Sequence, residues 1–330
     1  MTSPSSSPEA PNQPTRLGLG VTLGLLASLA FATSGPFVRP LFDIGWTPGA
    51  AVFWRVAAAA VLMVPVGLWL VRGRTRDLLA QWRAVLAFGV LAVATPQLMY
   101  FAAVSRMSVS IALLIEYMAP VALVLLAWVR TRHAPSRLVL SGTLAAVLGL
   151  LCVLDLTGAT PDALGVLFGF GAMIGAAAYF VLSARPTTLP PIALAAFGLA
   201  AGAVVLGLAL LVGLLPYSVA FVPVQLLGLS VAWWVPLGVV VVSATALAYA
   251  LGVAGISLMG ERLASFVSLS EVLFAALLAA VVLGEVPSAI QILGGVLIIF
   301  GVLLIRFASG RAPAGLPTLP DELEAAESGH

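Results

Sequence analysis

Long apolar runs alternate with short polar connections along the chain from residue 17 to residue 305. An α-helix rises about 1.5 Å per residue, so about 20 apolar residues span the roughly 30 Å hydrocarbon core of a bilayer. Ten runs have about this length, and the pattern predicts an all-α integral membrane protein with ten transmembrane helices. The runs are 17–38, 47–71, 84–105, 107–129, 137–154, 163–184, 190–214, 233–256, 261–283 and 287–305.

Three segments fall outside these runs. Residues 1–15 are rich in Ser and Pro and predict a disordered tail, and residues 308–330 are polar and acidic and predict a second tail. The segment 216–230 contains proline and is too short to cross a bilayer. We expect this segment to lie in the membrane interface.

The second half of the chain repeats the first half. An offset of 152 residues lays the fourth and fifth runs on the ninth and tenth, and an offset of 145 lays the first run on the sixth. The matched pairs are Pro135-Ser136 with Pro287-Ser288, Gly142 with Gly294, Gly149 with Gly301, Gly20 with Gly165 and Gly24 with Gly169. A unit of five spans crosses the membrane an odd number of times, so its second copy is inverted. The sequence therefore predicts two inverted five-helix repeats, residues 16–155 and 156–307, with a site near the midplane between them.

Two glutamates lie deep inside predicted spans. Glu116 is near the middle of the fourth run, and Glu271 of the ninth run aligns with Ala119, about one helical turn from Glu116. A charged side chain at the midplane costs at least about 2.5 to 3.5 kcal/mol, so each carboxyl needs a partner, a watery cavity or a proton. Pro120 lacks an N–H and frees a carbonyl, which suits a helix that lines a cavity. We predict that both carboxyls bind solute and a coupling proton; polar packing between helices is the alternative.

Other polar side chains inside the spans are further candidates for solute binding. Ser268 lies on one helical face with Glu271. Arg55 of the second run reaches either a cavity or the interface. For the aromatic hydroxyls the alternative to solute binding is packing or an interfacial position. The remaining candidates are Gln97, Tyr100, Tyr117, Tyr179 and Tyr249.

Composition narrows the class of protein further. With 62% hydrophobic and 8% charged residues and a mean hydropathy of +1.15, the chain has too few polar residues to cover a soluble globule. It contains no lysine, which removes the Walker A lysine of ATP-driven pumps and the Schiff-base lysine of retinal proteins. His133, His330 and Cys152 are too few and too scattered for a zinc site or a disulfide. We therefore expect no cofactor and no bound metal.

Arginines are distributed unequally between the two sides of the membrane. Assigning the connections to alternate sides places nearly all of them on one side and leaves only Arg39 and Arg106 on the other. Positive residues accumulate on the cytoplasmic side, so we predict that both termini are cytoplasmic and that the protein spans the inner membrane. The net charge of +2 reflects this orientation rather than nucleic-acid binding.

The chain resembles the drug/metabolite transporter superfamily, and in particular its EamA-type ten-helix members. The resemblance covers residues 17–306 and rests on the ten spans, the repeats, the segment ASFVSLSEVLFAALLAAVVLGEVPSAIQILGGVLIIFGVLLI and the related IALLIEYMAPVALVLLAW. Leu283-Gly284-Glu285 matches a family element that precedes the last helix. His133 stands in the first copy where Glu285 stands in the second, and Val272 replaces the proline that usually follows Glu271 in the family.

The resemblance implies transport of small solutes without ATP or a bound cofactor. We predict a secondary transporter that exports small metabolites, amino acids or drug-like solutes across the inner membrane by alternating access, as a uniporter or a proton antiporter. Its expected partners are a small-molecule solute, protons in the antiport case, and the lipid bilayer. The alternatives are a membrane-embedded enzyme, for which carboxyl, Ser and Tyr chemistry is present, and a non-transporting membrane protein.

Overall fold

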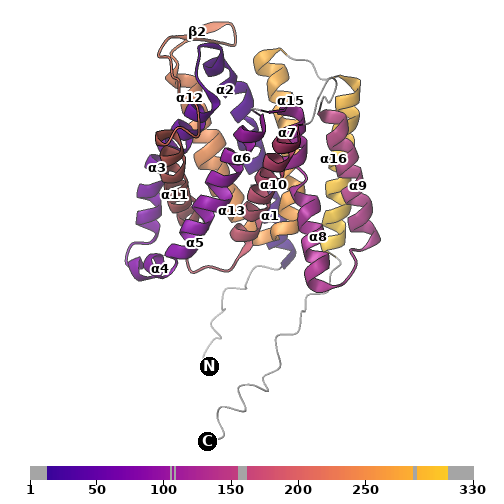
Figure 1. Cartoon of the computed structure of the whole chain (residues 1–330). Helices are drawn as coiled ribbons and strands as arrows, with labels where there is room; N and C mark the ends of the chain where they lie inside the picture. The colour runs from indigo at the N-terminus through magenta and orange to yellow at the C-terminus, as the bar shows by residue number, and fades with distance from the viewer. Residues whose placement is uncertain (1–12, 105, 108, 155–161, 285–287, 311–330) are drawn as a thin grey trace, which may run out of the picture.

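The computed structural model of the protein describes residues 13–104, 106–107, 109–154, 162–284 and 288–310 (Figure 1). In this part of the chain, nine helices are long and apolar enough to cross a membrane, and a tenth apolar helix, Arg137–Val153, is shorter. The predicted class, an all-α membrane protein with ten spans, is confirmed. The predicted tails lie almost wholly outside the described residues, and so does Glu285 of the family element.

Half of the spans consist of more than one helical segment. The first five spans are α1 (Gln13–Ala32) with α2 (Ser34–Asp43), α3 (Pro48–Leu70), α5 (Trp82–Ala87) with η1 (Phe88–Ala94) and α6 (Thr95–Val104), α7 (Val109–Glu116) with α8 (Ala119–Thr131), and α9 (Arg137–Val153). The last five are α10 (Ala163–Ala184), α11 (Pro191–Leu211), α12 (Trp234–Val239) with η2 (Val240–Leu247) and α13 (Ala248–Met259), α14 (Glu261–Ser268) with α15 (Ser270–Leu283), and α16 (Ala289–Gly310). A short helix, α4 (Thr75–Ala80), follows the second span, and strands β1 (Val224–Leu226) and β2 (Leu229–Val231) form a hairpin before the eighth.

Side-chain caps fix where several spans begin. The Thr47, Ser136 and Asp162 side chains accept hydrogen bonds from the backbone N–H groups three residues later, at the starts of α3, α9 and α10. These caps satisfy N–H groups that the first turn of a helix leaves without a partner. Short polar residues thus end these three connections where the apolar run begins.

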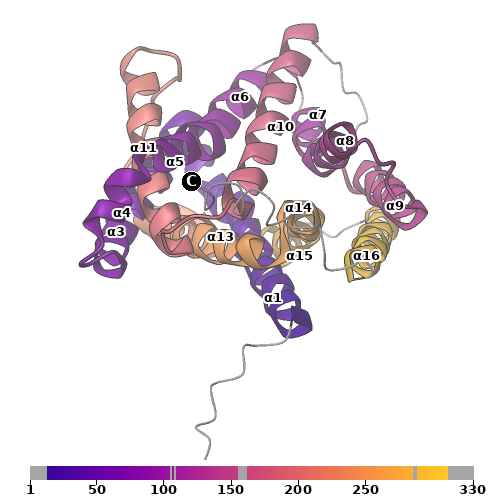
Figure 2. The same cartoon turned by 90° about the horizontal axis from the view of Figure 1, so that it is seen from below.

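The packing of the helices follows the inverted repeat. The fifth and tenth spans pack together as α9 against α16, and the second and seventh pack as α3 against α11 (Figure 2). The first span packs along the eighth, α1 against α13, and the equivalent pair in the other copy is the sixth against the third, α10 against α6. The first two pairs each join equivalent spans of the two repeats, and the last two pairs are equivalent to each other. Two inverted five-helix repeats produce this arrangement.

Two wide-turn segments occupy matching places in the repeats. The π-helices η1 and η2 begin at Phe88 and Val240, which are related by the repeat offset of 152 residues. In each segment a threonine hydroxyl donates to the carbonyl five residues earlier: Thr95 to Val90 at 2.8 Å and Thr245 to Val240 at 3.0 Å. These bonds occupy carbonyl oxygens in a stretch where the ordinary α-helical pattern is interrupted.

The fourth and ninth spans are interrupted, which the apolar pattern did not predict. The run from Met107 to Val129 was expected to be one helix, but a turn at Tyr117 and Met118 separates α7 from α8. Pro120, in the first turn of α8, lacks the N–H that a continuous helix would require there. In the ninth span the break falls at Leu269, between Ser268 and Ser270, whose hydroxyls both bond carbonyls three residues earlier.

The segment 216–230 folds back on the first two spans instead of crossing. Trp46 donates its indole N–H to the carbonyl of Ala220 at 2.7 Å, and its ring packs beside Phe221 and Trp233. Leu227 and Gly228, both with positive φ, form the hairpin turn. We call the face that carries this hairpin the hairpin face, and the opposite face, where α1 begins and α16 ends, the tail face (Figure 1).

Close packing of α9 on α16 depends on glycine. A Cβ added at Gly149 would lie 2.6 Å from the carbonyl oxygen of Gly294 and 2.8 Å from the amide nitrogen of Ile298, both backbone atoms. Gly142 and Gly301 face each other in the same way farther along the pair. Small residues let transmembrane helices approach to backbone contact, and this pair uses them at two levels.

We predict that Gly149→Ala destabilises the protein, because the new methyl group forces the two helix backbones apart. The expected loss is about 1 to 3 kcal/mol, seen as a lower melting temperature of the detergent-solubilised protein. Gly238→Ala is the matched control, because that helical glycine has no atom within 4 Å of an added Cβ. Equal melting temperatures of the two variants would contradict the prediction.

Candidate functional site

The breaks in the fourth and ninth spans bring the two intramembrane carboxyls into one region. Glu116 is the last residue of α7, and Glu271 is the second residue of α15. Their charges interact with each other, and both side chains are half-buried. The inverted repeat therefore places two carboxyl groups, one from each half of the chain, at the interrupted helices.

The two carboxyls occupy opposite ends of helical segments. Glu271 lies in the first turn of α15, where N–H groups point outward, and Glu116 lies at the carbonyl end of α7. The helix dipole stabilises a carboxylate at the first kind of end and not at the second. The two groups are thus close in space but lie in unlike electrostatic fields.

Arg55 supplies a positive charge to the same region. Its guanidinium interacts electrostatically with Glu271, Glu116 and Tyr249, and its Nη1 donates to the Ser34 hydroxyl at 2.7 Å. The Nε–H is buried and has no hydrogen-bond partner among the described residues. The sequence allowed Arg55 to reach either a cavity or the membrane interface. In the structure its guanidinium is turned toward the carboxyls, and its Nε–H is available to a ligand.

Aromatic side chains from five spans surround this charged group. Tyr249 packs edge-on against Phe31 at 5.3 Å and against Tyr179 at 5.6 Å between ring centroids, and Tyr179 lies 6.0 Å from Phe88. Tyr117, at the break in the fourth span, forms a side-chain hydrogen bond with Glu271. Tyr100 of α6 lies close enough to Glu116 to interact with its charge. All four tyrosines singled out from the sequence therefore lie in or next to the charged region.

Two other residues singled out from the sequence are less closely engaged. The Ser268 hydroxyl donates to the carbonyl of Ser265 at 2.7 Å, so its proton is used within its own helix. Gln97 is half-buried on α6 and makes no hydrogen bond with any described residue. Neither side chain forms a hydrogen bond with a carboxyl among the described residues.

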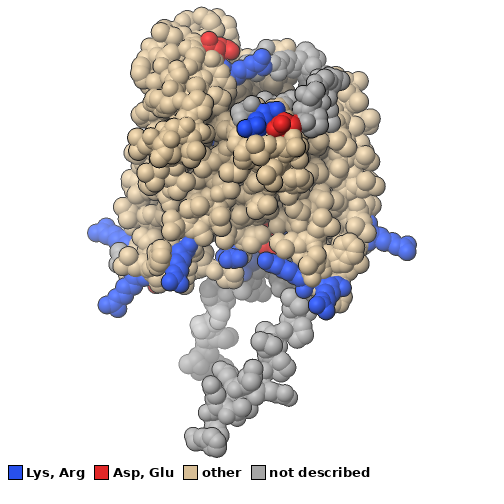
Figure 3. Space-filling model, viewed as in Figure 1, with Lys and Arg blue, Asp and Glu red and all other residues tan. Residues whose placement is uncertain are grey.

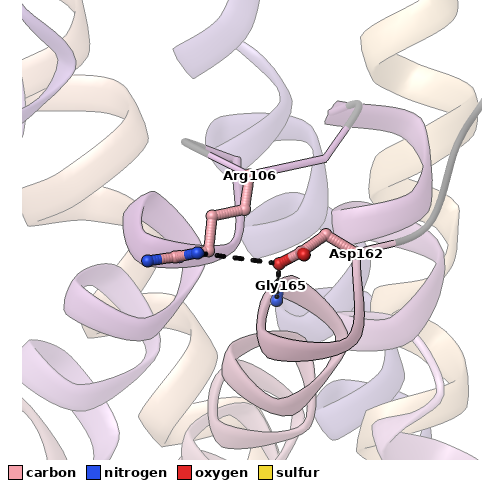
Figure 4. Close-up of polar contacts among 3 residues, drawn as sticks. All are labelled: Arg106, Asp162 and Gly165. Carbon is pink, nitrogen blue, oxygen red and sulfur yellow. Dashed lines mark hydrogen bonds and ion pairs between the residues drawn. The ribbon is translucent and has the colours of Figure 1, made fainter.

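One ion pair near the hairpin face was not predicted. Arg106, in the connection between α6 and α7, lies 3.9 Å from Asp162, whose carboxylate also accepts from the Gly165 N–H at 2.8 Å (Figure 4). Both side chains are nearly half exposed, so the pair contributes at most about 1 kcal/mol. The available signal was that both residues flank predicted spans on the same side of the membrane.

Two inverted five-helix repeats, each with an interrupted helix, are the architecture of secondary transporters. The model of the EamA-like transporter family matches residues 18–155 and again residues 163–307. The chain therefore belongs to the EamA-like transporter family. No curated protein matches the sequence. A solved crystal structure is similar in fold, with a TM-score of 0.70 and 21% identity over 89% of this chain and 99% of that one.

We predict that Tyr179 and Gly252 are coupled, because the Tyr179 hydroxyl occupies the space where a Cβ at position 252 would lie. Gly252→Ala alone should lower the free energy of unfolding by about 1 to 3 kcal/mol. In a Tyr179→Phe background the same change should be tolerated, because the next neighbours of the added Cβ lie 3.5 Å and 3.7 Å away.

The Tyr179→Phe change itself should have little effect, since the hydroxyl is buried without a hydrogen-bond partner among the described residues. Melting temperatures of the four proteins in detergent measure the coupling. An equal loss from Gly252→Ala in both backgrounds would show that the hydroxyl is not the obstacle.

Proposed function

We propose that this protein is a secondary transporter that moves small metabolites, amino acids or drug-like solutes across the membrane by alternating access. The observation that carries the proposal is the pair Glu116 and Glu271, at helices interrupted in both repeats, with the Arg55 charge beside them inside the spans. Ionisable groups at this depth are costly and are retained for substrate or ion binding. Membership of the EamA-like transporter family supports the same class of activity.

The side chains around the cluster favour a polar or amphipathic solute. Arg55 offers a buried N–H to an anionic or carbonyl group, and the glutamates offer acceptors to a cationic group or an N–H. Tyr179 and Tyr249 add flat apolar surface with hydroxyls at the edge. The remaining proposed solute-binding residues are Tyr117, Tyr100, Gln97 and Ser268.

We further propose export, by uniport or by proton antiport with Glu271 and Glu116 as the proton-binding groups. A carboxyl that binds either a proton or the solute couples their movements, because each occupies the site only when the other has left. The two histidines of the chain fall outside the predicted spans, and a tyrosine hydroxyl titrates near pH 10 in water, so the glutamates are the groups suited to exchange a proton. Glu271 is favoured, because its carboxyl forms a side-chain hydrogen bond with Tyr117.

The distribution of arginine supports an orientation with the tail face in the cytoplasm. Blue side chains ring the lower end of the molecule in Figure 3, the end at which α1 begins and α16 ends. Positive residues near span ends favour the cytoplasmic side. The bilayer that we propose is the inner membrane. With this orientation, the hairpin face and the Arg106–Asp162 pair lie outside.

We predict that the carboxyls are needed for transport but not for folding. Proteoliposomes loaded with a pH-sensitive dye are exposed to a panel of the common amino acids, small amines and small organic acids. An antiporter changes the internal pH when a transported solute is added. Glu271→Gln should reduce this flux about tenfold or more, as loss of about 1.4 kcal/mol does, while the melting temperature is retained.

Glu261→Gln is the matched control, because Glu261 begins the same span at the tail face. If the rate of solute uptake is the same with and without an imposed pH gradient, in the wild type and in Glu271→Gln, the protein is a uniporter and not a proton antiporter. Unchanged solute flux in both Glu116→Gln and Glu271→Gln would contradict a role for the carboxyls and leave polar packing as their explanation.

We predict that the tail face is cytoplasmic, and cysteine labelling on a Cys152→Ser background tests this orientation. A membrane-impermeant maleimide applied to whole cells should label a cysteine at Ser230 of the hairpin, and should label one at Arg74 only after the cells are permeabilised. Both positions are exposed, so access is decided by the membrane alone. The reverse pattern would place the tail face outside.

A further inference from the structure

The bundle divides into two groups of spans that meet across the candidate site. In one group, α10 packs against α6, η1 and α7; in the other, α1 packs against α13, α14 and α15. We call these the α10 half and the α1 half. The repeat exchanges them, because the sixth span corresponds to the first, the third to the eighth and the fourth to the ninth. Each pair of segments that joins the halves on one face therefore has an equivalent pair of segments on the other face.

The two halves are in contact on the tail side of the carboxyls. There, α10 packs against α13 and α14, and α8 packs against α14. One side chain from each of these four segments joins a single buried cluster: Leu123, Phe180, Ile256 and Ala264, with exposures of 3%, 6%, 2% and 2%. All four lie between the carboxyls and the tail face along their helices. We call this cluster the tail gate.

The corresponding contacts are missing on the hairpin side. On the hairpin side, α2 with α6 is equivalent to α10 with α13, α2 with α7 to α10 with α14, and α15 with α7 to α8 with α14. None of these hairpin-side pairs packs closely within the described residues. The positions equivalent to the tail gate are Ala275, Gly35, Val104 and Ala112. Gly35 is exposed, Val104 and Ala275 are half-buried, and Ala112 is buried only against its own half, beside Ala103 and Met107.

We infer that the tail gate closes the transport path on the tail face, and that this structure is the state in which the site is open toward the hairpin face. The inference rests on the proposed transport function. To release or accept solute at the tail face, the four side chains must separate and meet water. The tail gate contains Phe, Leu and Ile where the hairpin side has Gly, Ala and Val, so its closure buries more apolar surface than closure of the hairpin side. The protein at rest therefore favours the state that is closed at the tail face.

Ala264 and Ala275 are suitable reporter positions for this asymmetry. They lie on the same helical face of the ninth span as Glu271, one on each side of it. Cysteine replaces alanine at either position with a small change in volume. On a Cys152→Ser background, a membrane-impermeant maleimide is applied to vesicles of each orientation, without added solute.

Ala275→Cys should react from the hairpin face, and Ala264→Cys should not react from the tail face. Adding Phe180→Ala should raise the rate of Ala264→Cys labelling from the tail face at least tenfold and lower the rate of Ala275→Cys labelling. Phe170→Ala on the same helix is the matched control, because Phe170 is 47% exposed and far from the gate in sequence. It should change neither rate.

Rapid labelling of Ala264→Cys from the tail face without Phe180→Ala would overturn the inference. So would Phe180→Ala leaving both rates unchanged in a protein that still melts cooperatively. If Phe180→Ala prevents folding, Ile256→Ala is used in its place with the same expectation. If the labelling pattern is as expected but the protein moves no solute of the panel, the inference about the tail gate is supported and the proposed transport is contradicted. Failure of the inference and failure of the proposed function are therefore distinguishable.

Discussion

The requirement that backbone polar groups be satisfied inside the hydrocarbon governs this structure. An unbroken helix meets that requirement by itself, so a break leaves backbone groups that need other partners. At Leu269 the flanking Ser268 and Ser270 hydroxyls donate to backbone carbonyls of the same span, and after Tyr117–Met118 the residue Pro120 has no N–H to satisfy. Because the same breaks hold Glu116 and Glu271, the places where the backbone departs from regular helix are the places where charge can be held.

The inverted repeat explains most of the architecture, and its exceptions mark the site. The glycine contacts of α9 with α16 and the wide turns η1 and η2 obey the exchange of repeats. Arg55 departs from the repeat symmetry. The equivalent position lies in the seventh span, and the chain contains no charged residue between 186 and 260. One positive charge therefore faces two negative groups, and the site is electrostatically asymmetric although its scaffold is nearly symmetric.

The wide turns show how backbone geometry controls which side chains face the interior. An extra residue in a helical turn rotates everything after it by about 100° relative to what comes before. η2 ends just before Tyr249, which is 5% exposed and packs against Tyr179. η1 ends just before Pro96, whose ring contacts the backbone at Gly175 of α10. In both repeats the turn thus sets the packing of the segment that crosses the centre.

The sequence by itself determined the number and approximate limits of the spans, the inverted repeat, and the presence of Glu116 and Glu271 inside two of the spans. These features are local: hydropathy over about 20 residues decides whether a segment can enter a bilayer, and an internal match needs no contacts. Only the tertiary structure decided that two spans are broken, that Arg55 turns toward the carboxyls, and that Phe180 meets Ile256 on one face while Gly35 meets nothing on the other. The physical reason is that contacts between spans join atoms distant in sequence. Arg55 is held among Ser34, Glu116 and Glu271 of other spans, and which face closes depends on the packing of four spans at once.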